Sequence, residues 1–259
     1  MADAGWIWEG QGLDPGVYPS IFGIGEGAEF FGLRKARFLF HPTTELALGK
    51  LSKLEAVTPD ISKWIYKDVP SGGSVCAADA TLETQLAEAN KVGWFSKQFA
   101  NITGAYFDDM KGLMEREQNG LEALDQIRTT LRRHNANLEL HCVVYSHELE
   151  EPAFWAPLAH NMDVISFWFW GYERLERIDE ALKRCRDIFP EKPVYLGCYL
   201  RDYPTKSPMP MDSLRKQWLV LERALATGIV QGYEVLATVL IDGHLEQATW
   251  VRDFIRANS

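Results

Sequence analysis

The stretch VISFWFWGYERLERIDEALKRCRDIFPEKPVYLGCYL, residues 164–200, decides the fold class. Its two ends, 164–170 and 193–200, are short runs of aromatic and β-branched residues, which are typical of buried strands. Between them, apolar residues recur at intervals of three and four from Ile178 to Phe189, which predicts an amphipathic helix. The stretch therefore predicts a strand followed by a helix and a second strand.

The same alternation extends over the whole chain. Further strand-like runs are found at residues 6–9, 37–41, 63–67, 105–109, 138–147 and 233–240. Helical apolar stripes fill most gaps, among them Leu82–Phe99, Leu214–Leu225 and Leu245–Ile255. Eight strands alternating with helices predict a single (β/α)8 TIM barrel of parallel strands, with residues 1–259 as one domain. The first connection, Gly10–Gly27, is rich in Gly and Pro and is expected to be irregular; an open doubly wound sheet is the alternative fold.

Composition excludes several classes of function. The chain has 27 Lys and Arg against 36 Asp and Glu, a net charge of −9, without a basic block, so we expect no nucleic-acid partner. The longest apolar runs are too short to cross a bilayer, and we expect no membrane partner. No signal peptide is visible in this sequence, which leaves a cytoplasmic protein or one exported with its signal removed. No phosphate-binding or dinucleotide motif is present, so we expect no cofactor, and the oligomeric state stays open.

In a TIM barrel the active site lies at the carboxyl ends of the strands. Period-two alternation then selects the strand-end side chains that face inward. The resulting candidates for substrate binding are Glu9, His41, Tyr145, His147, Trp168, Trp170, Tyr199, Arg201 and Asp242.

The run Tyr106-Phe-Asp-Asp109 is the sharpest chemical feature. Two adjacent carboxylates at the end of an apolar strand can act as a proton donor and its electrostatic partner, because crowded like charges raise one pKa. The alternative interpretation is structural: the two residues form a salt bridge or cap the next helix, as Asp residues at strand ends often do.

The other candidates also have structural alternatives. Trp168 and Trp170 can stack against sugar rings, or they can simply pack in the core. An inward Arg201 can bind a carboxylate, or it can face solvent on a loop. His147 and His41 can bind a hydroxyl group or act as acids and bases, and each can equally be structural.

With the motif Gly104-Ala-Tyr-Phe-Asp-Asp109 at the end of the fourth predicted strand, the chain resembles the broad group of barrel-type glycoside hydrolases and their uncharacterised relatives. The resemblance implies a proton donor at this position. Two patterns of the group are absent: the Asn-Glu and Glu endings of the fourth and seventh strands, and the spaced aspartates of chitinases. Here the seventh predicted strand ends Tyr199-Leu-Arg201-Asp202.

We therefore expect a carbohydrate-active enzyme that hydrolyses a glycosidic bond in an oligosaccharide or small-molecule substrate, with Asp108 or Asp109 as the acid. The second carboxylate is expected to be Glu173, Asp202 or Glu9. One alternative is a non-catalytic sugar-binding barrel, which the missing seventh-strand Glu favours. Another is a metal-dependent sugar isomerase or lyase with ligands from Glu9, His41, Asp108 and His147. The leading hypothesis uses no metal.

Overall fold

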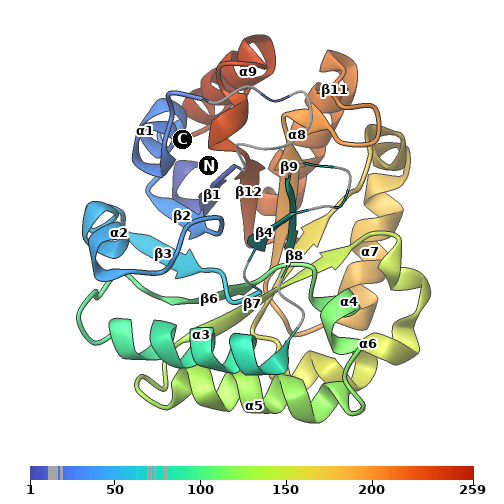
Figure 1. The fold of residues 1–259 in the computed structure, drawn as a ribbon. Helices are drawn as coiled ribbons and strands as arrows, with labels where there is room; N and C mark the ends of the chain where they lie inside the picture. The colour runs from blue at the N-terminus through green and yellow to red at the C-terminus, as the bar shows by residue number, and fades with distance from the viewer. Residues whose placement is uncertain are drawn as a thin grey trace.

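Eight parallel strands form one sheet that curls into a nearly closed barrel (Figure 1). The structure is a computed structural model that describes residues 1–10, 17, 20–62, 64–68, 70, 72, 74–78 and 81–259. In spatial order the strands are β3 (Ala56–Pro59), β2 (Lys35–Phe38), β1 (Gly5–Trp8), β12 (Gly232–Leu236), β9 (Val194–Tyr199), β8 (Val164–Trp168), β7 (Glu139–Tyr145) and β6 (Gly104–Phe107). The predicted parallel barrel is confirmed, and the doubly wound alternative is wrong.

The barrel closes along a seam between β3 and β6. Two isolated parallel bridges join Val57 to Ile102 and Asp60 to Tyr106. The backbone N–H of Ile61 also donates to the carbonyl oxygen of Tyr106, at 2.8 Å. These bridges bring the first and last strands of the sheet together and place the end of β3 beside the end of β6.

Helices surround the strands, as their apolar stripes predict (Figure 1). The α-helices are α1 (Ile24–Phe31), α2 (Glu45–Lys50), α3 (Leu82–Phe95), α4 (Met110–Met114), α5 (Gly120–Arg132), α6 (Pro152–Leu158), α7 (Ile178–Ile188), α8 (Met211–Ala226) and α9 (Leu245–Ala257). Short 3-10 helices are η1 (Ala2–Ala4), η2 (Glu148–Glu150), η3 (Ala159–Asn161), η4 (Tyr172–Arg177) and η5 (Thr238–Leu240). Two residue pairs, Arg201–Asp202 (β10) and Ser207–Pro208 (β11), form a small antiparallel ladder after β9.

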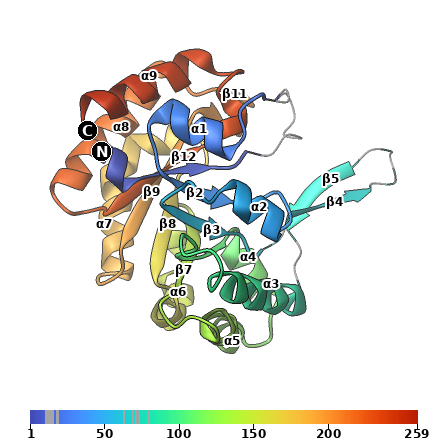
Figure 2. The same ribbon diagram turned by 90° about the vertical axis from the view of Figure 1, so that its left-hand side faces the viewer.

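The predicted third barrel strand at residues 63–67 is wrong. Residues Trp64–Asp68 (β4) do form a strand, but it pairs antiparallel with Ser74–Ala78 (β5) in a separate hairpin. Figure 2 shows this hairpin projecting away from the barrel, and Lys63 itself lies outside the described residues. The true third strand, β3, has only four residues and ends in Pro59, so its pattern is weaker than that of the hairpin.

The first connection of the barrel contains α1. Residues 11–16, 18 and 19 of the expected irregular segment lie outside the described residues. The helix spans Ile24–Phe31, so it begins inside the segment that was expected to be irregular. Gly32 ends it in the left-handed conformation, with φ of 71°, which glycine adopts at little cost.

Gly197 on β9 makes room for an aromatic ring inside the barrel. A Cβ atom at this position would lie 2.0 Å from ring atoms of Trp168 on the neighbouring strand β8. Trp168 is itself 2% exposed. Glycine at position 197 therefore has a packing reason, because it lets the indole lie close against β9.

The variant Gly197→Ala is expected to lose about 1–3 kcal/mol of stability, the usual cost of overpacking a core. The added methyl group must displace the Trp168 ring, which urea unfolding and tryptophan fluorescence would both report. A matched control is Gly25→Ala, because a Cβ atom at Gly25 meets no atom within 4 Å. Equal stability of the two variants would show that the indole has room to move.

Candidate active site

Asp108 and Asp109 follow β6 at the carboxyl end of the barrel. Asp108 is 3% exposed, and its Oδ1 accepts the backbone N–H of Asp109 at 3.0 Å. Asp109 has φ of 48°, a left-handed conformation that is strained for most residues and that Asp tolerates better. Strain of this kind is often found at functional sites.

Asp109 occupies the position before α4, but its side chain makes no capping hydrogen bond. Instead the Tyr145 hydroxyl group donates to Asp109 Oδ1 at 3.0 Å. The capping interpretation of Asp109 is therefore wrong. Burial raises the pKa of the Asp109 carboxyl group, and the hydrogen bond from Tyr145 opposes that rise in part.

Four aromatic side chains from β8, β9 and the segments that follow these strands extend this acidic centre. Trp168 and Tyr199 have ring centroids 4.9 Å apart, and Tyr199 meets Tyr203 edge to face at 5.4 Å. Trp170 stacks on Tyr203 at 5.3 Å and is 44% exposed. Together with Asp108, Asp109 and Tyr145, these residues are called the carboxyl-end cluster below.

The two aspartates and the aromatic residues share one environment. The negative charges of Asp108 and Asp109 add to burial in raising the pKa of both Tyr145 and Tyr199. Trp170 also meets Tyr145 edge to face at 6.1 Å. The structure thus brings together six of the residues that the sequence suggested, with Tyr203 beside them.

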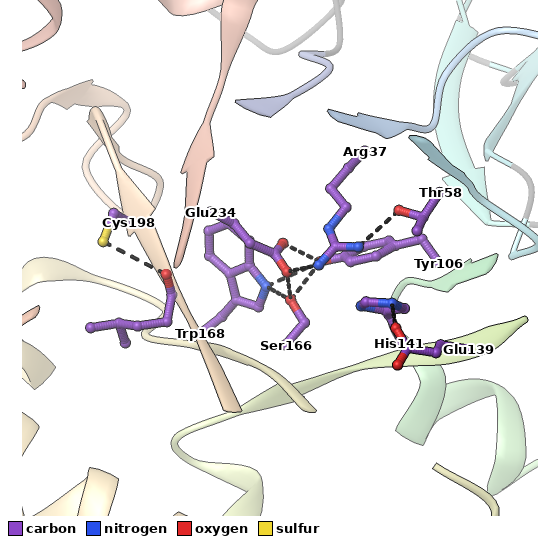
Figure 3. A network of polar contacts seen from close by, with 10 residues as sticks. Arg37, Thr58, Tyr106, Glu139, His141, Ser166, Trp168, Cys198 and Glu234 are labelled. Carbon is purple, nitrogen blue, oxygen red and sulfur yellow. Dashed lines mark hydrogen bonds and ion pairs between the residues drawn. The ribbon is translucent and has the colours of Figure 1, made fainter. Parts of the chain in front are cut away.

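Trp168 belongs to a buried polar network (Figure 3). Its indole N–H donates to the Ser166 hydroxyl group at 2.8 Å, and Ser166 donates to Glu234 at 2.9 Å. Tyr106 also donates to Glu234, at 2.9 Å. Arg37 completes the network with a 2.7 Å ion pair to Glu234, and both of these side chains are fully buried. The orientation of the indole ring therefore depends on a charged pair in the barrel interior.

Glu9 and His41 form a pair at the ends of β1 and β2. Glu9 is 5% exposed, and its Oε2 accepts the backbone N–H groups of Leu39 and Phe40 at 2.8 and 2.9 Å. Its Oε1 contacts His41 Nδ1, and this contact raises the pKa of the imidazole. Both oxygens of Glu9 are thus engaged, while most of the His41 ring faces solvent.

Two further carboxylate candidates hold loops. Asp202 is buried and accepts the backbone N–H groups of Tyr172 and Thr205 at 2.9 and 3.1 Å. Asp242 is exposed and accepts the Ser20 hydroxyl group at 2.7 Å, which anchors the connection after β1. Each of these side chains has a structural task in the fold.

The three remaining candidates differ in exposure. Glu173 is exposed on η4. His147 is exposed and stacks on Tyr145, with ring centroids 5.5 Å apart. Arg201 is 2% exposed, which rules out the solvent-facing alternative, and its charge contributes to lowering the pKa of His244.

Sequence reasoning missed two acidic residues at this end. Asp60 follows β3, is fully buried, and accepts both the backbone N–H and the hydroxyl group of Ser62. It was missed because the third strand was placed wrongly. Glu148 accepts the backbone N–H of Tyr145 at 2.9 Å, and burial raises its pKa to about 7. In the sequence, Glu148 is visible only as an acidic residue shortly after a strand. Such residues are common on loops, so nothing marked it as a site residue.

Two features are absent from the part of the chain that the structure describes. No group of three or more His, Cys, Asp or Glu side chains among them is arranged to hold a metal ion. None of the helices in that part of the chain combines the length and apolar character needed to cross a membrane.

Comparison with known proteins gives structural matches only. No protein-family model and no curated protein matches the sequence. A chitinase from Chromobacterium violaceum is similar over 96% of this chain and 99% of its own, with 11% identity and a TM-score of 0.58. A xylanase and α-amylase inhibitor protein, XAIP-II from Scadoxus multiflorus, is similar over 100% and 99%, with 12% identity and a TM-score of 0.58.

A β-glucuronidase from Bacteroides uniformis is also similar. It covers 92% of this chain, which spans 31% of that longer protein, with 11% identity and a TM-score of 0.56. Identities this low establish the shared architecture alone. The chain therefore has the barrel fold found in chitinases, in a β-glucuronidase and in an enzyme inhibitor.

Proposed function

We propose that this protein is a carbohydrate-active enzyme that hydrolyses a glycosidic bond, with Asp109 as its general acid. One observation carries the proposal: the Asp109 carboxyl group is held by Tyr145 rather than by a helix, and burial raises its pKa. A carboxyl group that keeps its proton at a higher pH than usual can protonate a leaving group. The neighbouring exposed ring of Trp170 offers a stacking surface for a sugar.

The reaction follows from this assignment. Asp109 gives its proton to the glycosidic oxygen as the bond from that oxygen to the anomeric carbon breaks. Water supplies the hydroxyl group that ends on the anomeric carbon, and its second proton goes to a carboxylate base. Asp108 supplies the negative charge next to the developing positive charge on the sugar ring.

Glu9, Glu173 and Asp202 are the proposed candidates for the second carboxylate. The structure favours none of the three strongly: Glu9 is bound to His41, Asp202 holds its loop, and Glu173 is exposed. A screen of the protein on aryl glycosides and oligosaccharides, followed by Glu9→Gln, Glu173→Gln and Asp202→Asn, tests these assignments. Absence of turnover on every saccharide that binds would overturn the enzymatic proposal.

The variant Tyr145→Phe is expected to shift the pH dependence of the reaction. The Tyr145 hydroxyl group stabilises the charged form of Asp109 and so lowers its pKa, hence its removal raises that pKa further. An acid with a higher pKa stays protonated to higher pH. The alkaline limb of the plot of kcat/KM against pH should therefore shift to higher pH. Tyr172→Phe, on η4, is the control and should leave the limb in place. A downward shift in Tyr145→Phe would contradict the role of Asp109 as acid.

A non-catalytic sugar-binding barrel is the second candidate function. Two observations favour it. Asp202, the carboxylate that follows β9, is bound to the backbone of its loop. One protein with the same fold is named as an enzyme inhibitor. Calorimetry with saccharides that bind but are never cleaved would support this candidate. The metal-dependent isomerase or lyase would require a stoichiometric divalent ion in the purified protein, which elemental analysis would detect.

A further inference from the structure

A groove lies on the outer side of the barrel, beside the carboxyl ends of β7 and β8. Its volume is about 310 Å³, within the range of small-molecule sites. Apolar atoms of Leu149, Phe169 and Ala181 line part of it. Three arginines, Arg174, Arg177 and Arg184, also line it.

The arginines of the groove are not neutralised equally. Arg177 is committed to Glu180 through two hydrogen bonds, at 2.8 and 2.6 Å. Arg174 and Arg184 are exposed, and neither makes an ion pair with any residue that the structure describes. Glu150 is the other acidic residue of the lining, so three positive charges face two negative ones, a net +1 in a chain whose net charge is −9. Positive charge at this place is therefore unusual for the molecule.

The groove lies near the carboxyl-end cluster. Ser146 and Phe169, which line the groove, directly follow Tyr145 and Trp168 of the cluster. The Ser146 hydroxyl oxygen is buried and has no hydrogen-bond partner among the described residues. His147 stacks on Tyr145 of the cluster. The positive charge of Arg174 adds to burial in lowering the pKa of the His147 imidazole. A saccharide bound at the cluster could thus extend a neighbouring unit into the groove.

We propose that this groove binds a negatively charged substituent, a carboxylate or a sulfate ester, on a saccharide chain whose adjacent unit occupies the candidate active site. The proposal rests on the proposed function and adds the substrate class. A planar guanidinium group matches the two oxygens of a carboxylate or sulfate with parallel hydrogen bonds.

The test measures binding to matched pairs of oligosaccharides that differ only in charge. Glucuronan and mannuronan oligosaccharides are compared with cello- and manno-oligosaccharides by calorimetry, and 6-sulfated cello-oligosaccharides distinguish sulfate from carboxylate. The protein is the full chain carrying Asp109→Asn, so that no ligand is consumed. We expect tighter binding of at least one acidic oligosaccharide than of its neutral partner, and weaker binding of it at high salt.

The double variant Arg174→Gln/Arg184→Gln should lose this preference. We expect its affinity for the acidic oligosaccharide to fall about 10-fold or more, the scale of a lost charged hydrogen bond, with unchanged affinity for the neutral one. Lys183→Gln is the matched control, because Lys183 is an exposed cation next to Arg184 on α7 but does not line the groove. Trp170→Ala should weaken the binding of acidic and neutral chains alike.

Three results would overturn the proposal: equal affinity for acidic and neutral chains, an unchanged preference in the double variant, or no binding of any saccharide. The failure of the proposed function looks different. In that case the acidic chain still binds through Arg174 and Arg184, but the protein with Asp109 intact does not cleave it.

Discussion

Replacing Asp109 by Asn is expected to lower kcat/KM by about 10²- to 10⁴-fold, the usual contribution of a general acid. The amide group keeps the size of the carboxyl group and can still accept the Tyr145 hydrogen bond, but it cannot donate a proton to the leaving oxygen. Stability should change little, because the carboxyl group is already disfavoured in its charged form by burial. Initial rates on an oligosaccharide, whose leaving group needs the proton, and a thermal unfolding curve measure the two effects.

Aryl glycosides also separate Asp109 from its neighbour. An acidic phenol leaves without a proton, so Asp109→Asn should be partly rescued on such substrates, whereas Asp108→Asn should be impaired on all of them. Asp125→Asn, an exposed carboxylate on α5, is the control. Full activity in both Asp108→Asn and Asp109→Asn would remove these residues from the mechanism.

Breaking the buried ion pair is expected to have the largest effect on stability. Arg37→Met leaves Glu234 without its cation in the barrel interior, where both side chains are fully buried, and should cost about 3–5 kcal/mol. The charge of Glu234 would then face only the hydroxyl groups of Tyr106 and Ser166. The change in the free energy of unfolding in urea is the measurement.

Two comparisons make this stability prediction specific. Arg34→Met removes ion pairs to Asp3 and Glu55 that are exposed, so its cost should stay below about 1 kcal/mol. The double variant Arg37→Met/Glu234→Met should recover part of the loss, because no lone charge stays buried. If Arg37→Met unfolds no more easily than Arg34→Met, the central pair does not stabilise the barrel.

Strong local patterns made most of the barrel predictable. Val164–Trp168 and Val194–Tyr199 stand out because they lie in apolar runs rich in aromatic and β-branched residues. β3 was not recognised because four residues ending in proline carry little periodicity, while the aromatic β4 nearby carries more. Period-two reasoning finds strands, but it does not tell a barrel strand from one in a hairpin.

The candidate site was predictable only in part, for a related reason. Adjacent acids at the end of β6 are visible in the sequence, and so are the aromatic residues after β8. Pairings between distant positions are not visible. Arg37 meets Glu234 across 197 residues, and Asp202 is committed to a loop through contacts with Tyr172 and Thr205 that no spacing rule reveals. The same limit concealed Asp60, whose neighbour Tyr106 lies on a strand that follows much later in the chain.

The pairing between β3 and β6 is the weak point in the closure of the barrel. Two isolated bridges join these strands there, whereas β9 pairs with β12 over five residues. Amide hydrogens at the seam, such as that of Ile61, should therefore exchange with solvent through local opening sooner than those between β9 and β12. β6 is the edge strand on one side of this seam, and Asp108 follows it. Local opening of the seam therefore moves the proposed acids relative to Glu9 and His41. A ligand that contacts residues on both β3 and β6 would hold the seam closed. Slower hydrogen exchange of the seam amides would then report binding even if no reaction takes place.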